Sequence, residues 1–236
     1  MIAKTVLEFD AALCGQGLDA RRLPSTASGF PMWLVDAEQS NVEAFEHLLS
    51  SEEMEAANRF RFRALRHRYI AAHGALHMLL RDRYGVPADA WDIGKDSFGK
   101  PHLIRFPQIH YSLSYSGGFA MLGINESEPI GVDIEVLRTV EDAAELMDLH
   151  FTEAEQSVAM RTSSPDACYS KEFLGIWVRK EACVKACGRG LSIPLKDVEC
   201  VSEDQVTTVQ FGGGRYRTGA LELGDPIMAW SRRTSL

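Results

Sequence analysis

Residues 109–135 read IHYSLSYSGGFAMLGINESEPIGVDIE, and this stretch contains three predicted strands. Within it, residues 109–115 and 119–124 have the composition of strands and flank Ser116-Gly117-Gly118. A glycine turn between two such segments predicts a pair of strands joined by a tight connection. The PIGVDIE segment at 129–135 predicts a further strand.

N-terminal to this stretch, the sequence predicts one strand and two helices. Residues 30–36 (FPMWLVD) are typical of a strand, and Ser50 with Glu53 fits a capping box that opens a helix. Residues 64–84 carry apolar side chains at helical spacing, and Gly85 is expected to end that helix.

C-terminal to it, helices are expected at about 140–149 and 169–188, and Thr152 with Glu155 suits a second capping box. After Pro194 the sequence becomes strand-like in four segments, 197–201, 205–211, 215–223 and 226–231. Short, mostly antiparallel strands interspersed with helices predict an α+β fold. Residues 125–128 (NESE) are the best candidate for its midpoint.

The composition excludes several classes of protein. With 236 residues, 45% of them hydrophobic, the chain can bury a core as one large or two small domains. No apolar run approaches the roughly 18 residues of a membrane span, and the N-terminus lacks the features of a signal peptide. Five irregularly spaced cysteines predict reduced thiols in a cytoplasmic protein. A net charge of −8 argues against general nucleic-acid binding.

The charge is uneven, because residues 59–83 contain seven arginines and a single acid, Asp82. Binding of a polyanionic ligand would explain this segment. A solvated helix face would explain it equally well, and without further evidence it is the simpler explanation.

Asp133 and Glu135 lie two residues apart on the predicted strand, so both carboxylates project to one face while Val132 and Ile134 face the core. Two converging carboxylates repel each other unless a cation lies between them. Mg²⁺ is typically bound by one or two carboxylates together with substrate phosphates. On this pattern alone, a solvated acidic face is the stronger interpretation.

Residues 177–191 read WVRKEACVKACGRGL. On a helix, Glu181 and Lys185 are i,i+4 neighbours, which is consistent with a surface salt bridge or with two groups aimed at one phosphate. Gly188 and Gly190 would end the helix in a tight turn.

Three weaker features have ordinary alternatives. In the FGKP segment at 98–101 a glycine and a proline bracket Lys100, which suits a phosphate contact or a plain turn. The alternating hydroxyls of Ser112, Ser114 and Ser116 suit an anion or a hairpin without function. His73 and His77 are i,i+4 on the predicted helix, but no third ligand is evident, which favours packing over zinc.

Taken in order, these segments resemble the Sfp-type 4′-phosphopantetheinyl transferase family. The matching pieces span about 50 to 200 and are FGKP at 98–101, SLSYS at 112–116, GVDIE at 131–135, FTEAE at 151–155 and WVRKEACVKACGRGL at 177–191. The resemblance implies two similar α/β halves with pseudo-two-fold symmetry, expected here as residues 1–125 and 126–236, with coenzyme A in the cleft between them.

The resemblance also implies the reaction. The 4′-phosphopantetheine arm of coenzyme A would pass to a serine of an apo acyl or peptidyl carrier protein, releasing 3′,5′-ADP. Mg²⁺ would be held by Asp133, Glu135 and Glu181. Glu181 would be the general base, directly or through a metal-bound water, and Lys185 would stabilise charge on the departing phosphate. The expected contacts to coenzyme A are Arg68, Lys100, Pro101, Ser114, Tyr115, Asp133, Glu181 and Lys185.

Three departures from the family pattern put the 3′-phosphate and adenine contacts in question. Tyr115 stands where the family usually has a histidine that contacts the 3′-phosphate, so that contact is expected to be weaker or to be shared by a group such as Arg66 or Arg68. Ser112 stands where the family often has an asparagine, and Glu53 and Ala56 stand where some members have basic residues.

Two other functions fit part of the same residues: a Mg²⁺-dependent pyrophosphate hydrolase and a coenzyme A-binding regulator without catalytic activity. For the transferase we expect a cytoplasmic monomer that serves fatty-acid, polyketide or peptide synthesis, with neither a nucleic acid nor a membrane as partner.

Overall fold

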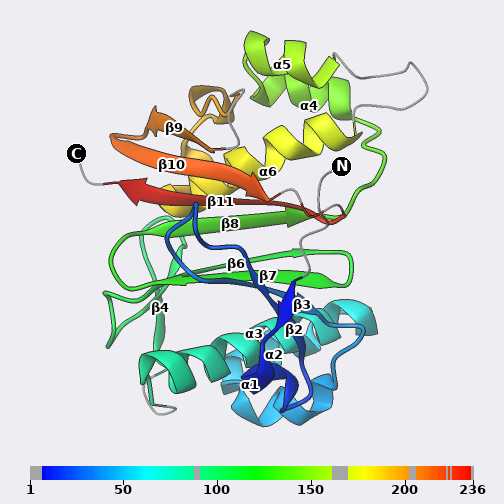
Figure 1. The fold of residues 1–236 in the computed structure, drawn as a ribbon, viewed down its shortest axis with the longest axis vertical. Helices are drawn as coiled ribbons and strands as arrows, with labels where there is room; N and C mark the ends of the chain where they lie inside the picture. Colours follow the sequence, from blue (N-terminus) through cyan, green and yellow to red (C-terminus); the bar gives the residue numbers. More distant parts are fainter. Residues whose placement is uncertain are drawn as a thin grey trace.

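The structure is a computed structural model that describes residues 7–87, 91–160, 170–201, 206–221, 223 and 225–234. It contains two antiparallel sheets, each covered on its outer side by helices. Figure 1 shows the resulting layers in order: α3, the sheet that contains β3, β6 and β7, the sheet that contains β8 and β11, and α6.

The first sheet has the strand order β1 (Glu8–Phe9), β2 (Asp19–Leu23), β3 (Met32–Asp36), β7 (Phe119–Asn125) and β6 (His110–Ser116). The expected β6–β7 pair is confirmed as an antiparallel hairpin, and Gly117 turns the chain with a φ of 55°. A positive φ is readily adopted by glycine, which explains the Ser-Gly-Gly sequence at this turn.

The second sheet has the order β8 (Ile130–Glu135), β11 (Ile227–Thr234), β10 (Gly214–Leu221) and β9 (Val206–Phe211). These strands confirm four of the sequence-based expectations. The strand expected at 197–201 is wrong, because residues 195–197 form a 3₁₀ turn and residues 198–201 are irregular. Their backbone groups bind a buried ion pair instead of a neighbouring strand: Val198 O accepts from Lys180, and Cys200 N donates to Glu155.

One long helix packs on the outer face of each sheet, and shorter helices surround it. On the first sheet, α3 (Arg63–Tyr84) contacts β3 and β7 and α1 (Ala11–Cys14) contacts β2, while a 3₁₀ helix (Val42–Leu48) and α2 (Ser51–Asn58) pack on α3. On the second, α6 (Ser170–Cys187) contacts β8, β10 and β11, α5 (Glu153–Met160) and a 3₁₀ turn (Gly190–Ser192) pack on α6, and α4 (Ala143–His150) contacts the 3₁₀ turn at 195–197. A small sheet of β4 (Ile93–Lys95) and β5 (Pro101–Leu103) completes the fold.

Local sequence signals explain where several helices begin and end. Ser50 and Glu53 form the expected capping box of α2, and Thr152 and Glu155 exchange the same two hydrogen bonds at α5. At the end of α3, Gly85 has the left-handed φ of 64° that favours glycine.

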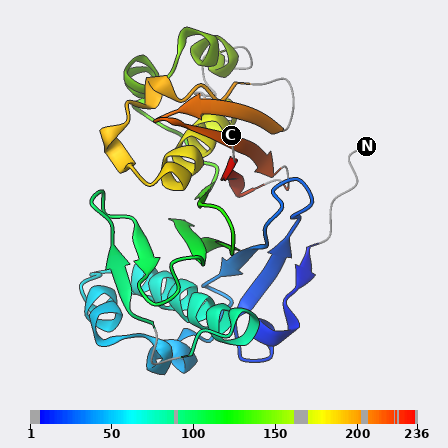
Figure 2. The same ribbon diagram turned by 90° about the vertical axis from the view of Figure 1, so that its left-hand side faces the viewer.

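One apolar core lies beneath α3, and another lies between the two sheets. The second includes Met32 and Met121 from the first sheet with Val132, Ile134 and Trp230 from the second. Each half is thus an antiparallel sheet with one long helix, as the expected pseudo-two-fold relation requires, and the α+β prediction is confirmed. Figure 2 shows the two halves one above the other. Their treatment as domains at 1–125 and 126–236 stays a prediction.

Strands β6 and β8 lie side by side where the two sheets meet. Serine hydroxyls of β6 supply contacts there: Val132 N donates to Ser112 Oγ at 3.1 Å, and Val136 N donates to Ser116 Oγ at 3.0 Å. The alternating serines of the SLSYS segment therefore join the halves. No helix in the described part of the chain is long and apolar enough to cross a bilayer.

Candidate active site

Gly131 allows α6 to lie directly on β8. A Cβ at this position would collide with the carbonyl oxygen of Ala182 and the amide nitrogen of Ala186, which belong to the helix backbone. Only glycine permits so close an approach of two backbones. The contact brings the helix face that carries Glu181 and Lys185 against the strand that carries Asp133.

Asp133 is the buried centre of this arrangement. Its Oδ1 accepts hydrogen bonds from Lys185 Nζ at 2.7 Å and from Ser114 Oγ at 2.6 Å. Lys185 Nζ also donates to Val132 O at 3.2 Å. The lysine that the sequence placed one turn after Glu181 is therefore paired with the carboxylate of the neighbouring strand.

Glu135 lies on the same face, nearer the surface. Its Oε2 accepts from Ser116 Oγ at 2.7 Å and lies 3.8 Å from Arg138 Nε. Arg68 of the other half is close enough for the charge of Glu135 to act on its guanidinium. As the alternation along β8 predicted, Val132 and Ile134 are buried on the opposite face.

Glu181 is held in an environment that disfavours its charged form. Partial burial is the largest cause of a raised pKa for this carboxyl, and the charges of Asp133 and Glu135 raise the pKa further. Lys185 opposes the shift without cancelling it. A carboxyl with a raised pKa in a group of acids is a candidate acid or base.

The oxygen-only donor set of Asp133, Glu135 and Glu181 suits Mg²⁺, which binds carboxylates and phosphates. The raised pKa of Glu181 shows that the three carboxylates act on one another. The carboxylate oxygens of these three residues do not all lie within 4.8 Å of one another, however. Within the described ranges, only Glu53, His73 and His77 place three such atoms within 4.8 Å of one another. Repulsion between the acids, and the pairing of Asp133 with Lys185, account for this separation.

Lys100 points into the junction between the halves. Its Nζ donates to the carbonyl oxygens of Ile130 at 3.1 Å, Lys185 at 2.6 Å and Ala186 at 3.3 Å. The last two are carbonyls of the final turn of α6, where a cation is favourable. Burial lowers the pKa of Lys100 to about 8. The predicted phosphate contact of Lys100 stays a prediction.

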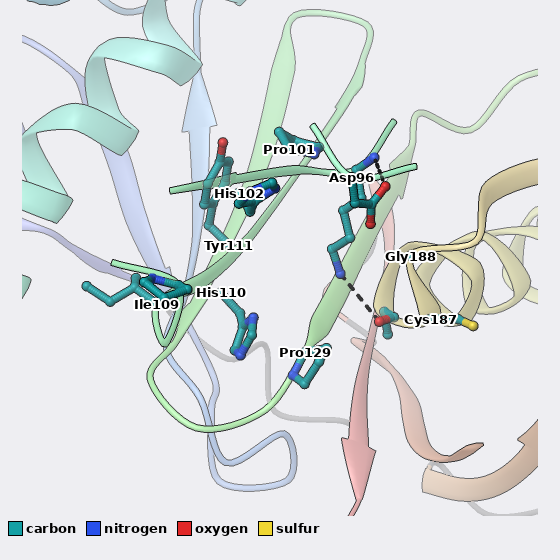
Figure 3. Close-up of a pocket in the computed structure, with 12 residues that line it drawn as sticks. Asp96, Pro101, His102, Ile109, His110, Tyr111, Pro129, Cys187 and Gly188 are labelled. Atoms are coloured by element: carbon teal, nitrogen blue, oxygen red, sulfur yellow. Dashed lines mark hydrogen bonds between the residues drawn. The ribbon is translucent and has the colours of Figure 1, made fainter. Parts of the chain in front are cut away.

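A pocket of about 290 Å³ lies beside Lys100. Figure 3 shows Asp96, Pro101, His102 and His110 on one side, facing the end of α6 on the other. Pro101 belongs to β5, so the FGKP segment forms part of the pocket wall. The pocket thus joins elements of both halves.

Arg68 and Tyr115 lie together at the β6–β7 turn. Arg68 donates to Gly117 O at 2.7 Å, and its guanidinium carbon lies 5.5 Å from the centre of the Tyr115 ring. Burial, and then Tyr69, raise the pKa of Tyr115, so its hydroxyl is neutral.

Most arginines of the basic segment at 59–83 face acidic side chains, and anion binding by this segment stays a prediction. Five of its seven arginines lie within salt-bridge distance of acids: Arg59 with Glu55, Arg63 with Glu43, Arg66 with Glu46, Arg81 with Asp82 and Arg83 with Asp10. Acidic residues that are distant in sequence, such as Glu43 and Asp10, supply several of these partners.

Sequence reasoning missed two groups of charged side chains. Lys180 and Glu155 form a fully buried ion pair at 2.6 Å that ties α6 to α5. Glu155 was identified only as a capping residue, and Lys180 only as a neighbour of Glu181. The statement that His73 and His77 lack a third ligand is wrong, because Glu53 of α2 faces both imidazoles.

Comparisons with known proteins agree with the resemblance. The family profile of the 4′-phosphopantetheinyl transferase superfamily matches residues 129–224. The 4′-phosphopantetheinyl transferase HetI of Nostoc sp. is 33% identical over 173 residues, covering 71% of this chain and 72% of the relative. The 4′-phosphopantetheinyl transferase Sfp of Bacillus subtilis is 26% identical over 157 residues, covering 66% and 68%.

A third relative, the 4′-phosphopantetheinyl transferase psf-1 of Bacillus pumilus, is 27% identical over 173 residues, covering 73% of this chain and 72% of its own length. The profile match at residues 129–224 includes β8 and α6, the two elements that carry Asp133 and Glu181. The chain therefore belongs to the 4′-phosphopantetheinyl transferase superfamily.

Proposed function

We propose that this protein transfers the 4′-phosphopantetheine arm of coenzyme A to a serine of an apo carrier protein and releases 3′,5′-ADP. Family membership supports the reaction class. The observation that supports this site is the convergence of Glu181, Asp133 and Lys185 where α6 crosses β8.

The reaction is a displacement at phosphorus. The serine oxygen of the carrier forms a bond to the β-phosphorus of coenzyme A, and the bond from that phosphorus to the oxygen of 3′,5′-ADP breaks. The serine hydroxyl must lose its proton, and Glu181 is the candidate acceptor. Its raised pKa suits this role, because a base whose pKa lies nearer neutrality accepts a proton more readily.

Lys185 is the candidate group for the charge that develops on the leaving phosphate. Its pairing with Asp133 fixes the direction of the ammonium before substrate binds. Asp133, Glu135 and Glu181 would hold Mg²⁺, which when bound would neutralise pyrophosphate charge. Ser114 and Ser116 orient two of these carboxylates by donating to them.

The nucleotide end of coenzyme A would contact Arg68, Lys100, Pro101, Ser114 and Tyr115. Arg68 is the candidate cation for a phosphate, because the neutral Tyr115 hydroxyl beside it can supply only a hydrogen bond. Pro101 and the stem of Lys100 line the pocket between the halves. We also propose that the protein acts as a cytoplasmic monomer, with a carrier protein and coenzyme A as its partners.

The test is to incubate the protein with coenzyme A, Mg²⁺ and several apo carrier proteins, and to weigh each carrier by mass spectrometry. We expect at least one carrier to gain one phosphopantetheine group, with 3′,5′-ADP released in equal amount. No mass gain on any carrier would refute the transferase. Release of 3′,5′-ADP without a carrier would favour a hydrolase, and binding of coenzyme A without turnover would favour a regulator.

A further inference from the structure

Outside the proposed active site, a cluster of ionisable side chains joins α2 to α3. His73 Nδ1 lies 2.6 Å from Glu53 Oε1, and His77 Nε2 lies 2.8 Å from Glu53 Oε2. The two histidines are one helical turn apart, so both rings project from the same side of α3 toward α2. The cluster lies in the N-terminal half, away from Asp133 and Glu181.

Neighbouring residues fix the positions of all three side chains. Ser50 N donates to Glu53 Oε2 at 2.8 Å as part of the capping box, which orients the carboxylate. Tyr69 stacks on the His73 ring at 4.0 Å, and Trp91 lies against the His77 ring at 3.9 Å. An oriented carboxylate and an apolar shell of this kind are what metal sites use around their ligands.

The carboxylate of Glu53 lies between the two imidazoles, with Oε1 at 2.6 Å from His73 Nδ1 and at 3.0 Å from His77 Nε2. His77 Nδ1 is buried and has no hydrogen-bond partner among the described residues. The Glu53 carboxylate lies 2.8 Å from Nε2 of His77, so in the metal-free protein the ring proton is held on Nε2, and zinc would displace it from that nitrogen.

We propose that Glu53, His73 and His77 bind one zinc ion, through a carboxylate oxygen, Nδ1 of His73 and Nε2 of His77. Two imidazoles and one carboxylate are a donor set typical of zinc, whereas Mg²⁺ prefers oxygen ligands alone. Bonds of about 2.0–2.1 Å at tetrahedral angles would separate the ligand atoms by about 3.3 Å. At present Oε1 of Glu53 lies 2.6 Å from His73 Nδ1 and 3.0 Å from His77 Nε2, and the three ligand atoms lie within 4.8 Å of one another, so the side chains would have to move slightly apart to admit the ion.

Bound zinc would cross-link two helices, because Glu53 comes from α2 and both histidines come from α3. Helix α2 has only eight residues, which is too short to be stable without tertiary contacts. The ion would therefore act as a structural brace in the N-terminal half. This proposal does not depend on the transferase reaction.

The test uses full-length protein without an affinity tag, stripped of metal with a chelator and then mixed with zinc chloride. After gel filtration we expect about one equivalent of zinc, measured by mass spectrometry of the element. Glu53→Gln, His73→Gln and His77→Gln should each weaken zinc binding at least about 10-fold. His67→Gln, on the same helix but outside the cluster, and Asp133→Asn, in the proposed active site, should retain the ion.

A second measurement on the unaltered protein covers the possibility that a variant fails to fold. Zinc should shift the ring-nitrogen resonances of His73 at Nδ1 and of His77 at Nε2 in histidine-selective NMR spectra. Absence of retained zinc, unchanged ring resonances, or loss of zinc in Asp133→Asn but not in the histidine variants would each overturn the proposal.

Discussion

Glu53 in the N-terminal half and Glu181 in the C-terminal half are helical glutamates in opposite surroundings. Glu53 faces two imidazoles, and hydrogen bonds from them lower its pKa despite burial. Glu181 faces two carboxylates, and these add to the effect of burial in raising its pKa. Environments that shift the pKa values of two carboxyl groups in opposite directions suit the two groups to different roles. The first belongs to the scaffold, as a proposed zinc ligand, and the second is poised to take a proton or Mg²⁺ at the proposed active site.

The same contrast extends to the surrounding charges. In the N-terminal half most arginines of α3 and the segment before it are paired with acids. In the proposed active site Lys185 faces Asp133, while Glu181 and Glu135 add further negative charge nearby. Unpaired like charge costs stability, and a protein retains it where chemistry needs it.

The largest effect on stability is expected from the buried pair of the C-terminal half. Lys180→Met leaves Glu155 charged and fully buried, although Thr152 N and Cys200 N still donate to it. Breaking one side of a buried pair typically costs about 3–5 kcal/mol. Urea unfolding should therefore give a free energy of unfolding that is lower by that amount. A loss below about 1 kcal/mol would mean that α6 is held mainly by apolar packing.

Gly131→Ala should separate α6 from β8 and so disperse the active-site charges. Overpacking typically costs about 1–3 kcal/mol, and carrier modification should fall strongly even in the folded fraction, because reacting groups lose their alignment. Gly175→Ala is the matched control on α6, since a Cβ there meets nothing within 4 Å. If both variants keep full transfer rates, close contact at Gly131 is not what assembles the site.

Lys100 should make stability depend on alkaline pH. Its folded pKa of about 8 lies below the ordinary value of 10.5, so between these values the unfolded chain binds more protons. Stability should therefore rise as pH increases from about 8 towards 10. Lys100→Met should flatten this rise in unfolding curves measured across that range. If the slope of stability against pH is unchanged in Lys100→Met, another group causes the rise.

The smallest effect is expected on the exposed side of the basic segment. Arg59 and Glu55 are both mostly exposed and lie 3.8 Å apart. Arg59→Ala should change stability by less than about 0.5 kcal/mol, because water screens such pairs. Transfer activity should also be unchanged, since Arg59 contacts none of the proposed site residues. A marked loss of activity would instead indicate that residues 59–83 form an anion-binding surface.

Much of the fold was predictable because its signals are local. Both capping boxes, the turn at Gly117 and the end of α3 at Gly85 depend on residues within one or two turns of the chain. The strand predicted at 197–201 does not form, because backbone groups of Val198 and Cys200 bind Lys180 and Glu155. The positions of these two side chains follow from tertiary packing. Local patterns carry no information about such partners.

The candidate site divides in the same way. Alternation along β8 predicted that Asp133 and Glu135 share a face, and helical spacing predicted that Glu181 and Lys185 are neighbours. That Lys185 pairs with Asp133 depends on the crossing of α6 over Gly131, which only the fold provides. Glu53 and His73 are twenty residues apart, so their contact likewise required the packing of α2 on α3.

The most direct test compares Glu181→Gln with Glu53→Gln in the carrier-modification assay, alongside thermal unfolding of both proteins. We expect Glu181→Gln to lower the transfer rate at least about 100-fold. Its unfolding temperature should stay within a few degrees of that of the unaltered protein. Glu53→Gln should lower the unfolding temperature and keep the transfer rate per folded molecule. Full transfer by Glu181→Gln, or loss of transfer confined to Glu53→Gln, would contradict the assignment of chemistry to the C-terminal half.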